Sequence, residues 1–157
     1  MVKKHRKPSR HRLDAGILAA KARKIVPHEF VLDALAPLSP VTRSMFGCLA
    51  VYVNDRIVLF LRDRQDWPED NGVWLATTAQ HHASLQREFP QMRSIRLLRR
   101  EVTHWQVLPI EAPDFEEAAL RACELVRAHD PRIGKIPNSQ LRSRSRGKKR
   151  TVRTRRE

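Results

Sequence analysis

Two stretches near the middle of the chain alternate in the way that β-strands do. Residues 49–53 and 57–61 are almost wholly apolar, and their side chains fall on two faces with a period of two. Asn54 and Asp55 between them tolerate turn geometry, which predicts a hairpin. Because both faces are apolar, we expect the hairpin to lie centrally and to be covered by helices or by a partner. A two-residue loop predicts the facing pairs Val53 with Arg56, Val51 with Val58 and Leu49 with Phe60.

The rest of the chain shows helical spacing, strand alternation and clear stop signals. Apolar spacing that ends at prolines predicts helices over 14–26, 28–36 and 78–89, with Asp14 and Thr78 as caps. A last helix begins at Asp114, where Asp114 and Glu117 resemble a capping box, and ends before Pro131. Further strands are predicted over 73–77, 94–98 and 104–108, the last two joined by a charged turn at 99–101.

This order of elements predicts the fold class. After a first helix come three strands, a helix, two strands and a helix, and hairpin-length links make neighbouring strands antiparallel. We therefore expect an α+β domain of two layers, with an antiparallel sheet packed on helices. The domain is predicted to span residues 13–136, between basic disordered tails at 1–12 and 137–157 that are too poor in apolar residues to fold.

The charge of the chain lies at its two ends. The formal net charge is +14 over 157 residues. Residues 1–12 carry six basic residues and no acid, and residues 142–157 carry nine basic residues and one acid. The span 13–141 therefore has sixteen residues of each sign and is formally neutral.

Membrane and redox signals point to a soluble cytoplasmic protein. The longest uncharged stretches, such as 45–53, fall far short of the roughly 18 apolar residues of a membrane helix, and no export signal is readable. Cys48 and Cys123 stand far apart without a CxxC pattern, so we expect reduced cysteines in the core and no disulfide or zinc ribbon.

The segment 41–61 also resembles a known family. It shows an arginine, a Met-Phe-Gly opening to a hairpin, a tyrosine in the next strand and a polar turn, and similar element order extends over about 30–130. In these features it resembles the N-terminal domain of the TfoX/Sxy competence-regulator family. The resemblance implies a small α+β fold similar to YjbR-like proteins and secretion chaperones, and a role in regulation rather than catalysis. The family-motif residues are Arg43, Met45, Phe46, Gly47 and Tyr52.

The sequence contains no complete motif for catalysis, metal binding or a cofactor. A nucleophilic Cys48 needs a partner that lowers its pKa, and adjacent His81 and His82 point about 100° apart, so they cannot share a metal. The acidic stretch 63–72 fails the calcium-loop spacing and is expected to be a solvated loop, and Gly134-Lys135 lies in no phosphate-binding loop. We expect no enzyme activity and no cofactor.

Two binding roles remain open. The first is a non-catalytic regulatory or protein-interaction module that binds an unknown protein partner or a second copy, with a tryptophan as anchor if one is exposed beside Arg43 or Arg62. The alternative is non-specific binding of RNA or DNA through the tails, because flexible clusters of cations follow a phosphate backbone. The candidate contact residues are Lys3, Lys4, Arg6, Lys7, Arg142, Arg144, Arg146, Lys148, Lys149, Arg150, Arg153, Arg155 and Arg156.

Overall fold

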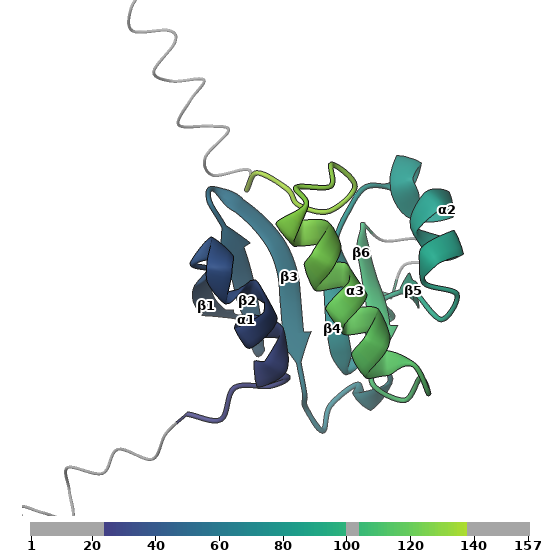
Figure 1. The fold of residues 1–157 in the computed structure, drawn as a ribbon. Helices are drawn as coiled ribbons and strands as arrows, with labels where there is room; N and C mark the ends of the chain where they lie inside the picture. Colours follow the sequence, from purple (N-terminus) through teal and green to yellow (C-terminus); the bar gives the residue numbers. More distant parts are fainter. Residues whose placement is uncertain (1–23, 100–103, 138–157) are drawn as a thin grey trace, which may run out of the picture.

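Six antiparallel strands form one sheet in the order β1-β2-β3-β4-β6-β5 (Figure 1). The structure is a computed structural model that describes residues 24–99 and 104–137. The first four strands are neighbours in the order of the chain, and β6 then joins the far side of β4. The strands are β1 (Val41–Met45), β2 (Cys48–Val53), β3 (Arg56–Arg62), β4 (Gly72–Ala76), β5 (Arg93–Ser94) and β6 (Trp105–Pro109).

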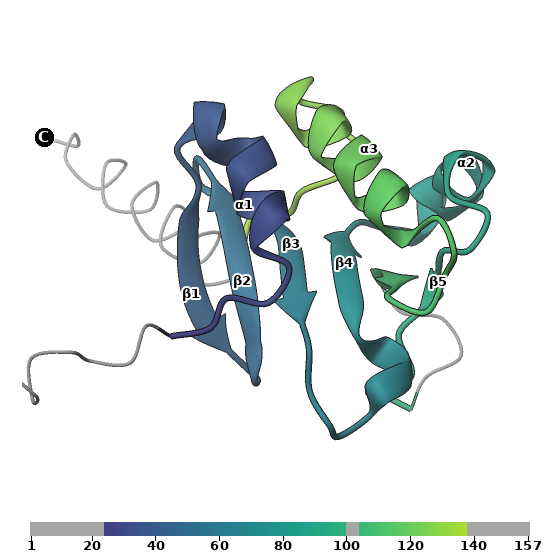
Figure 2. The same ribbon diagram turned by 60° about the horizontal axis from the view of Figure 1, so that its bottom comes forward.

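Three α-helices lie on the same side of this sheet (Figure 2). They are α1 (Glu29–Leu35), α2 (Ala79–Glu88) and α3 (Phe115–Arg127), with short 3-10 turns at Ala36–Leu38 and Pro68–Asp70. Helices α1 and α3 pack against each other over the middle of the sheet, and α2 lies toward its β5 end (Figure 1). The predicted α+β class with an antiparallel sheet is confirmed.

Both faces of the sheet are apolar, as the sequence of the hairpin predicts. The larger core lies between sheet and helices and includes Leu59, Leu61 and Leu75 from the strands with Leu35 and Leu85 from the helices. A second cluster forms on the opposite face. It contains Cys48, Ala50, Ile57, Phe60, Trp74, Ala76, Ile95 and Val107, with Met45, Tyr52, Leu97 and Trp105 packed against it and partly exposed.

The β2–β3 hairpin has the predicted turn but a different register. Val53 faces Arg56 as expected, and the register then shifts between Val51 and Tyr52. A β-bulge at Val58 explains the shift, because one extra residue in β3 moves every later pair by one. The predicted pairs of Val51 with Val58 and Leu49 with Phe60 are therefore wrong. Val51 faces Leu59, and Leu49 faces Leu61.

Several predicted elements are corrected. Strand β1 was not predicted, because its polar side chains lack strand alternation, yet it pairs along its whole length with β2. The predicted strand 94–98 is limited to Arg93–Ser94. Most of the predicted helix 14–26 and of the turn 99–101 lies outside the described residues, and the described part, 24–26, is not helical.

The predicted helix caps are also corrected. Thr78 and Asp114 stand at the N-cap positions of α2 and α3, but neither side chain makes a capping hydrogen bond. The resemblance of Asp114 and Glu117 to a capping box is therefore not realised. Helix α3 still has acidic residues in its first turn and Arg127 in its last, which suits the helix dipole.

Candidate functional site

The family-motif residues gather at the β1–β2 hairpin. Met45 pairs with Cys48, so the loop consists of Phe46 and Gly47 alone. Both have positive φ, 51° and 72°, which is the backbone pattern of a tight hairpin turn whose twist matches the strands. Gly47 suits this conformation, and a side chain there would also collide with the Arg64 guanidinium.

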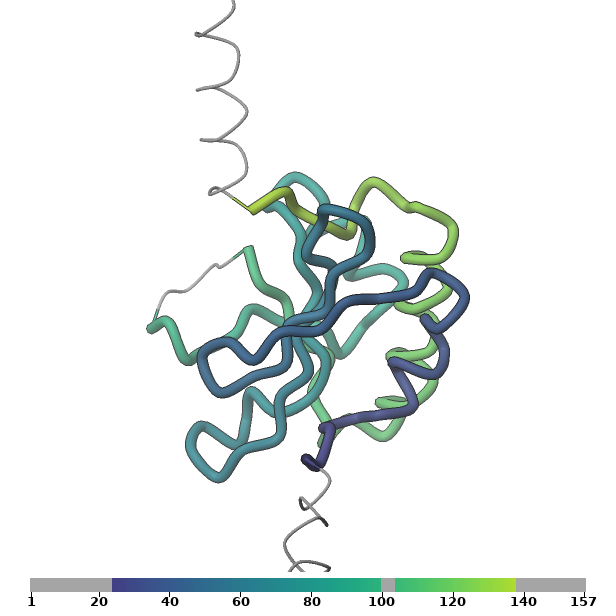
Figure 3. The backbone as a smooth tube through the Cα atoms, turned by 90° about the vertical axis from the view of Figure 1, so that its left-hand side faces the viewer, coloured from purple at the N-terminus to yellow at the C-terminus, as the bar shows by residue number. Residues whose placement is uncertain are grey.

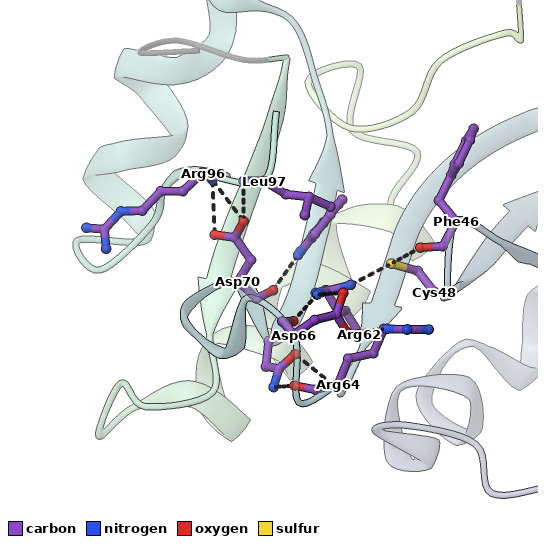
Figure 4. Close-up of polar contacts among 10 residues, drawn as sticks. Phe46, Cys48, Arg62, Arg64, Asp66, Asp70, Arg96 and Leu97 are labelled. Carbon is purple, nitrogen blue, oxygen red and sulfur yellow. Dashed lines mark hydrogen bonds and ion pairs between the residues drawn. The ribbon is translucent and has the colours of Figure 1, made fainter. Parts of the chain in front are cut away.

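Phe46 is exposed at the tip of this hairpin. A bulky residue at positive φ is strained, and Phe46 is 85% exposed, so the ring does not offset the strain by burial. In Figure 4 its side chain points away from the polar residues below it. Phe46 is therefore an accessible aromatic at the tip of a two-residue turn.

Strand β1 is an open edge of the sheet. Its one neighbour in the described sheet is β2 (Figure 3, which views the molecule from the β1 side). Residues 41–44 are all exposed. The guanidinium carbon of Arg43 lies 5.4 Å from the centre of the Tyr52 ring across the β1–β2 pair. The structure thus brings Arg43 and Tyr52 together and leaves the backbone edge of β1 accessible.

Behind the turn, Cys48 lies beside a buried arginine. The Arg62 Nη1 is 4.0 Å from the Cys48 Sγ, and the thiol points toward the Phe46 carbonyl at 3.7 Å (Figure 4). Burial raises the pKa of Cys48, although Arg62 acts in the opposite direction. The thiol is therefore protonated at neutral pH and is not an activated nucleophile.

Contacts at the end of β3 hold Arg62 in place. Its Nη2 donates to the Asp66 carbonyl and lies 3.5 Å from the Asp66 Oδ2, and its Nε has no hydrogen-bond partner among the described residues. The Arg64 Nε bonds Asp66 Oδ1 at 2.6 Å, and this bond holds the pKa of Asp66 below its usual value. The His28 Nε2 bonds the Arg62 carbonyl at 2.9 Å, so that nitrogen is engaged away from the Cys48 thiol.

A cleft of about 550 Å³ opens beside the turn. Apolar residues Ile25 to Pro27 form one wall, and Gly47, Cys48 and Leu49 form the other. The charged residues at its rim are Lys24, Asp63 and Arg64. The cleft reaches the thiol and has the Asp63 carboxylate in its lining, but the described contacts of the Cys48 thiol are to Arg62 and to the Phe46 carbonyl.

One acidic residue of the loop predicted to be solvated is instead buried. Asp70 is 0% exposed, and its carboxylate accepts from the backbone N–H groups of Arg96 and Leu97 (Figure 4). It also accepts from the Arg93 side chain. The Asp70 carbonyl accepts from the Trp74 indole at 2.7 Å. This network ties residues 93–97 to the sheet, so the role of Asp70 is structural.

The histidines of the described residues form no metal site. Burial, with smaller contributions from His104, Lys135 and His81, lowers the pKa of His82. Within 24–99 and 104–137, His, Cys, Asp and Glu side chains form no group of three or more that could hold a metal ion. None of the helices in these ranges combines the length and the apolar character that crossing a membrane requires.

The candidate nucleic-acid contacts of the tails lie outside the described residues, so the structure does not test them. No family model, no curated protein and no solved structure matches this chain.

Proposed function

We propose that this chain is a non-catalytic regulatory or protein-interaction module of TfoX N-terminal type that binds an extended segment of a partner protein along β1. The observation that supports the proposal most directly is the β1–β2 hairpin. It presents an open strand edge and, at its tip, a strained and exposed phenylalanine.

The open edge favours strand addition. In an antiparallel pair, backbone N–H groups point alternately toward and away from the neighbouring strand. Since Met45 and Cys48 close a two-residue loop, this alternation directs the N–H groups of Thr42 and Ser44 outward. An extended peptide that pairs with them gains backbone hydrogen bonds, as in other cases of β-augmentation.

The tip adds a specific contact. Exposed aromatics at strained positions lower stability, and their presence is explained when the ring anchors a partner. Phe46 at one end of β1 and Val41, which is 55% exposed, at the other would flank a paired segment with apolar side chains.

A proline substitution tests this proposal. Thr42→Pro removes one outward N–H and leaves the bonds to β2 in place, because edge strands accept proline at such positions. Thr42→Ala, which keeps the N–H, is the matched control. The full chain, with a photo-cross-linking phenylalanine analogue at position 46, is added to an extract of the cells that produce it. We expect the parent chain and Thr42→Ala to form cross-links in this extract and Thr42→Pro to form none.

Cross-links that persist in Thr42→Pro would count against β1 pairing. Light scattering of the purified chain distinguishes the two kinds of partner. A mass of two chains that reverts to one in Thr42→Pro indicates self-association, and a single-chain mass with cross-links to other proteins indicates a separate partner.

The charge distribution supports a second candidate function, non-specific binding of RNA or DNA through the tails. The basic excess lies in residues 1–12 and 142–157, and the span between them is neutral. Binding of this kind releases counterions, so its affinity falls steeply with salt. Anisotropy of labelled duplexes and single strands between 50 and about 200 mM salt tests this candidate, and a flat salt dependence would contradict it.

A further inference from the structure

The face of the sheet opposite the helices carries aromatic rings paired with cations. Here the Arg43 guanidinium carbon lies 5.4 Å from the centre of the Tyr52 ring, and the Lys135 Nζ lies 6.0 Å from the centre of the Trp105 ring. Tyr52 and Trp105 both pack against the second apolar cluster and are partly exposed. Each ring therefore lies at the boundary between this cluster and solvent.

Rings beneath the surface support this arrangement. Trp105 lies 4.6 Å from Phe60 and 6.5 Å from Trp74, measured between ring centres, and both partners are buried. Residues Ile95 and Leu97 cover part of the same cluster. At the end of this segment the Arg99 guanidinium carbon lies 5.8 Å from the centre of the Trp67 ring, which makes a third cation and ring pair.

Charge separates between the two layers of the domain. None of the six described strands contains Asp or Glu, whereas they contain Arg43, Arg56, Arg62 and Arg93. Arg62 and Arg93 are ion-paired with Asp66 and Asp70, so the cations beside the rings of this face are Arg43, Arg99 and Lys135. Helices α1 and α3 carry two arginines against five exposed carboxylates. These carboxylates are Glu29, Asp33, Glu116, Glu117 and Glu124.

This combination selects a chemical class of ligand. A polyanion is attracted to the cations beside these rings and repelled by the carboxylates of α1 and α3. Planar rings and guanidinium groups add stacking surfaces for unpaired bases, and proteins that bind single strands combine stacking rings with cations. A duplex hides its bases from such a surface.

We propose that the sheet face around Arg43, Tyr52, Trp105 and Lys135 binds single-stranded nucleic acid by stacking its bases. Tyr52 on β2 and Trp105 on β6 offer two stacking positions with β3 and β4 between them. The site shares Arg43 with β1 but uses side chains on the sheet face, whereas the proposed function uses the backbone edge of β1, so the two are tested separately.

The test separates base stacking from phosphate binding by the tails. Fluorescence anisotropy of the full chain is measured with a 12-nucleotide oligothymidylate and with an abasic strand of the same length, which carries the same phosphates. Stacking of one base commonly changes affinity by about fivefold or more, and two stacked bases by more than about tenfold. We expect the full chain to bind oligothymidylate at least about tenfold more tightly than the abasic strand.

Variants locate the preference on the sheet. Arg43→Gln with Tyr52→Leu is expected to remove the preference for bases, because it removes a cation and a ring while keeping an apolar side chain on the cluster. Arg127→Gln on α3 is the matched control, with the same loss of charge on the opposite layer, and is expected to retain the preference. Arg43→Gln alone changes one exposed side chain and is expected to keep the fold, so a reduced preference in it reports the loss of the Arg43 cation.

Tryptophan fluorescence gives a second readout. Oligothymidylate is expected to quench the emission of the chain through Trp105, and the abasic strand is not. Equal affinity for the two strands would overturn the proposal. It would indicate that the tails alone hold nucleic acid and that the sheet face binds protein. A base preference that survives in the double variant would overturn it as well.

Discussion

The guanidinium Nη1 of Arg62, a residue that is 1% exposed, lies 4.0 Å from the thiol sulfur of Cys48. A cation at this distance normally favours the thiolate. Here burial of the thiol outweighs it and raises the pKa of Cys48. The pair therefore consists of a protonated thiol and a buried cation, an arrangement suited to packing rather than to catalysis.

Removal of this cation should make the thiol less reactive. Arg62→Met keeps much of the side-chain volume but abolishes the influence of Arg62 that lowers the pKa of Cys48. We expect the pH midpoint of Cys48 alkylation to lie above that of an ordinary cysteine in the parent chain and to rise further in Arg62→Met. Alkylation rates between pH 7 and about 10, with the labelled residue identified by mass spectrometry, measure both midpoints. A midpoint that falls in Arg62→Met would contradict this account.

Cys123 should make the fold sensitive to alkali. Burial raises the pKa of Cys123 from 9.0 to about 12. Above pH 9 the unfolded chain releases this proton while the folded chain retains it, so stability that is present below pH 9 is lost as the pH rises toward 12. The expected slope is about 1.4 kcal/mol per pH unit. Urea unfolding between pH 8 and about 10.5 should show a shallower decline in Cys123→Ala, and equal slopes would contradict the prediction.

Loss of the Asp70 carboxylate should destabilise the fold strongly. Asp70→Ala leaves the N–H groups of Arg96 and Leu97 without an acceptor and the Arg93 side chain without its carboxylate. Disruption of a buried, hydrogen-bonded ion pair typically costs about 3–5 kcal/mol. The exposed Asp63 in the same loop serves as control, and Asp63→Asn should change stability by less than about 0.5 kcal/mol. Equal effects of the two substitutions in urea unfolding would disprove the assigned role of Asp70.

Relief of the strain at Phe46 should stabilise the chain. Asparagine adopts positive φ more readily than phenylalanine, and Phe46 buries little of its ring in the described structure. Phe46→Asn is therefore expected to raise the free energy of unfolding by about 1 kcal/mol while it weakens partner binding. Thermal unfolding checks the first effect, and binding of the partner identified by cross-linking, compared between Phe46→Asn and the parent chain, checks the second. A destabilised Phe46→Asn would indicate that the ring packs against the fold.

The sequence predicts the strands and helices whose pattern reflects burial on a sheet or helix face. Val51, Leu59 and Leu75 each belong to the set of every second residue of their strand that faces the larger core. The apolar stripe of α3 has the same cause, because that side of the helix is buried. Strand β1 has no such pattern, since its side chains are exposed. Its position depends on pairing with β2, which local composition does not reveal.

The buried polar groups were predictable only in part. Alternation from Phe60 places Arg62 on the same face, but nothing in the sequence indicates that Asp66 approaches it across a short loop. The Asp70 carboxylate accepts hydrogen bonds from residues more than twenty positions away. Such contacts arise from the tertiary fold and leave no periodic signal. The β-bulge at Val58 likewise depends on the pairing of two whole strands.

The order of the sheet also implies an order of assembly. Strands β1 to β4 form a meander in which each strand pairs with the next, so four strands can form by closing short loops. The pairing of β6 with β4 spans about thirty residues and α2, and such non-local contacts close more slowly. The same hairpin that carries Phe46 therefore belongs to the local part of the chain, where folding is expected to begin.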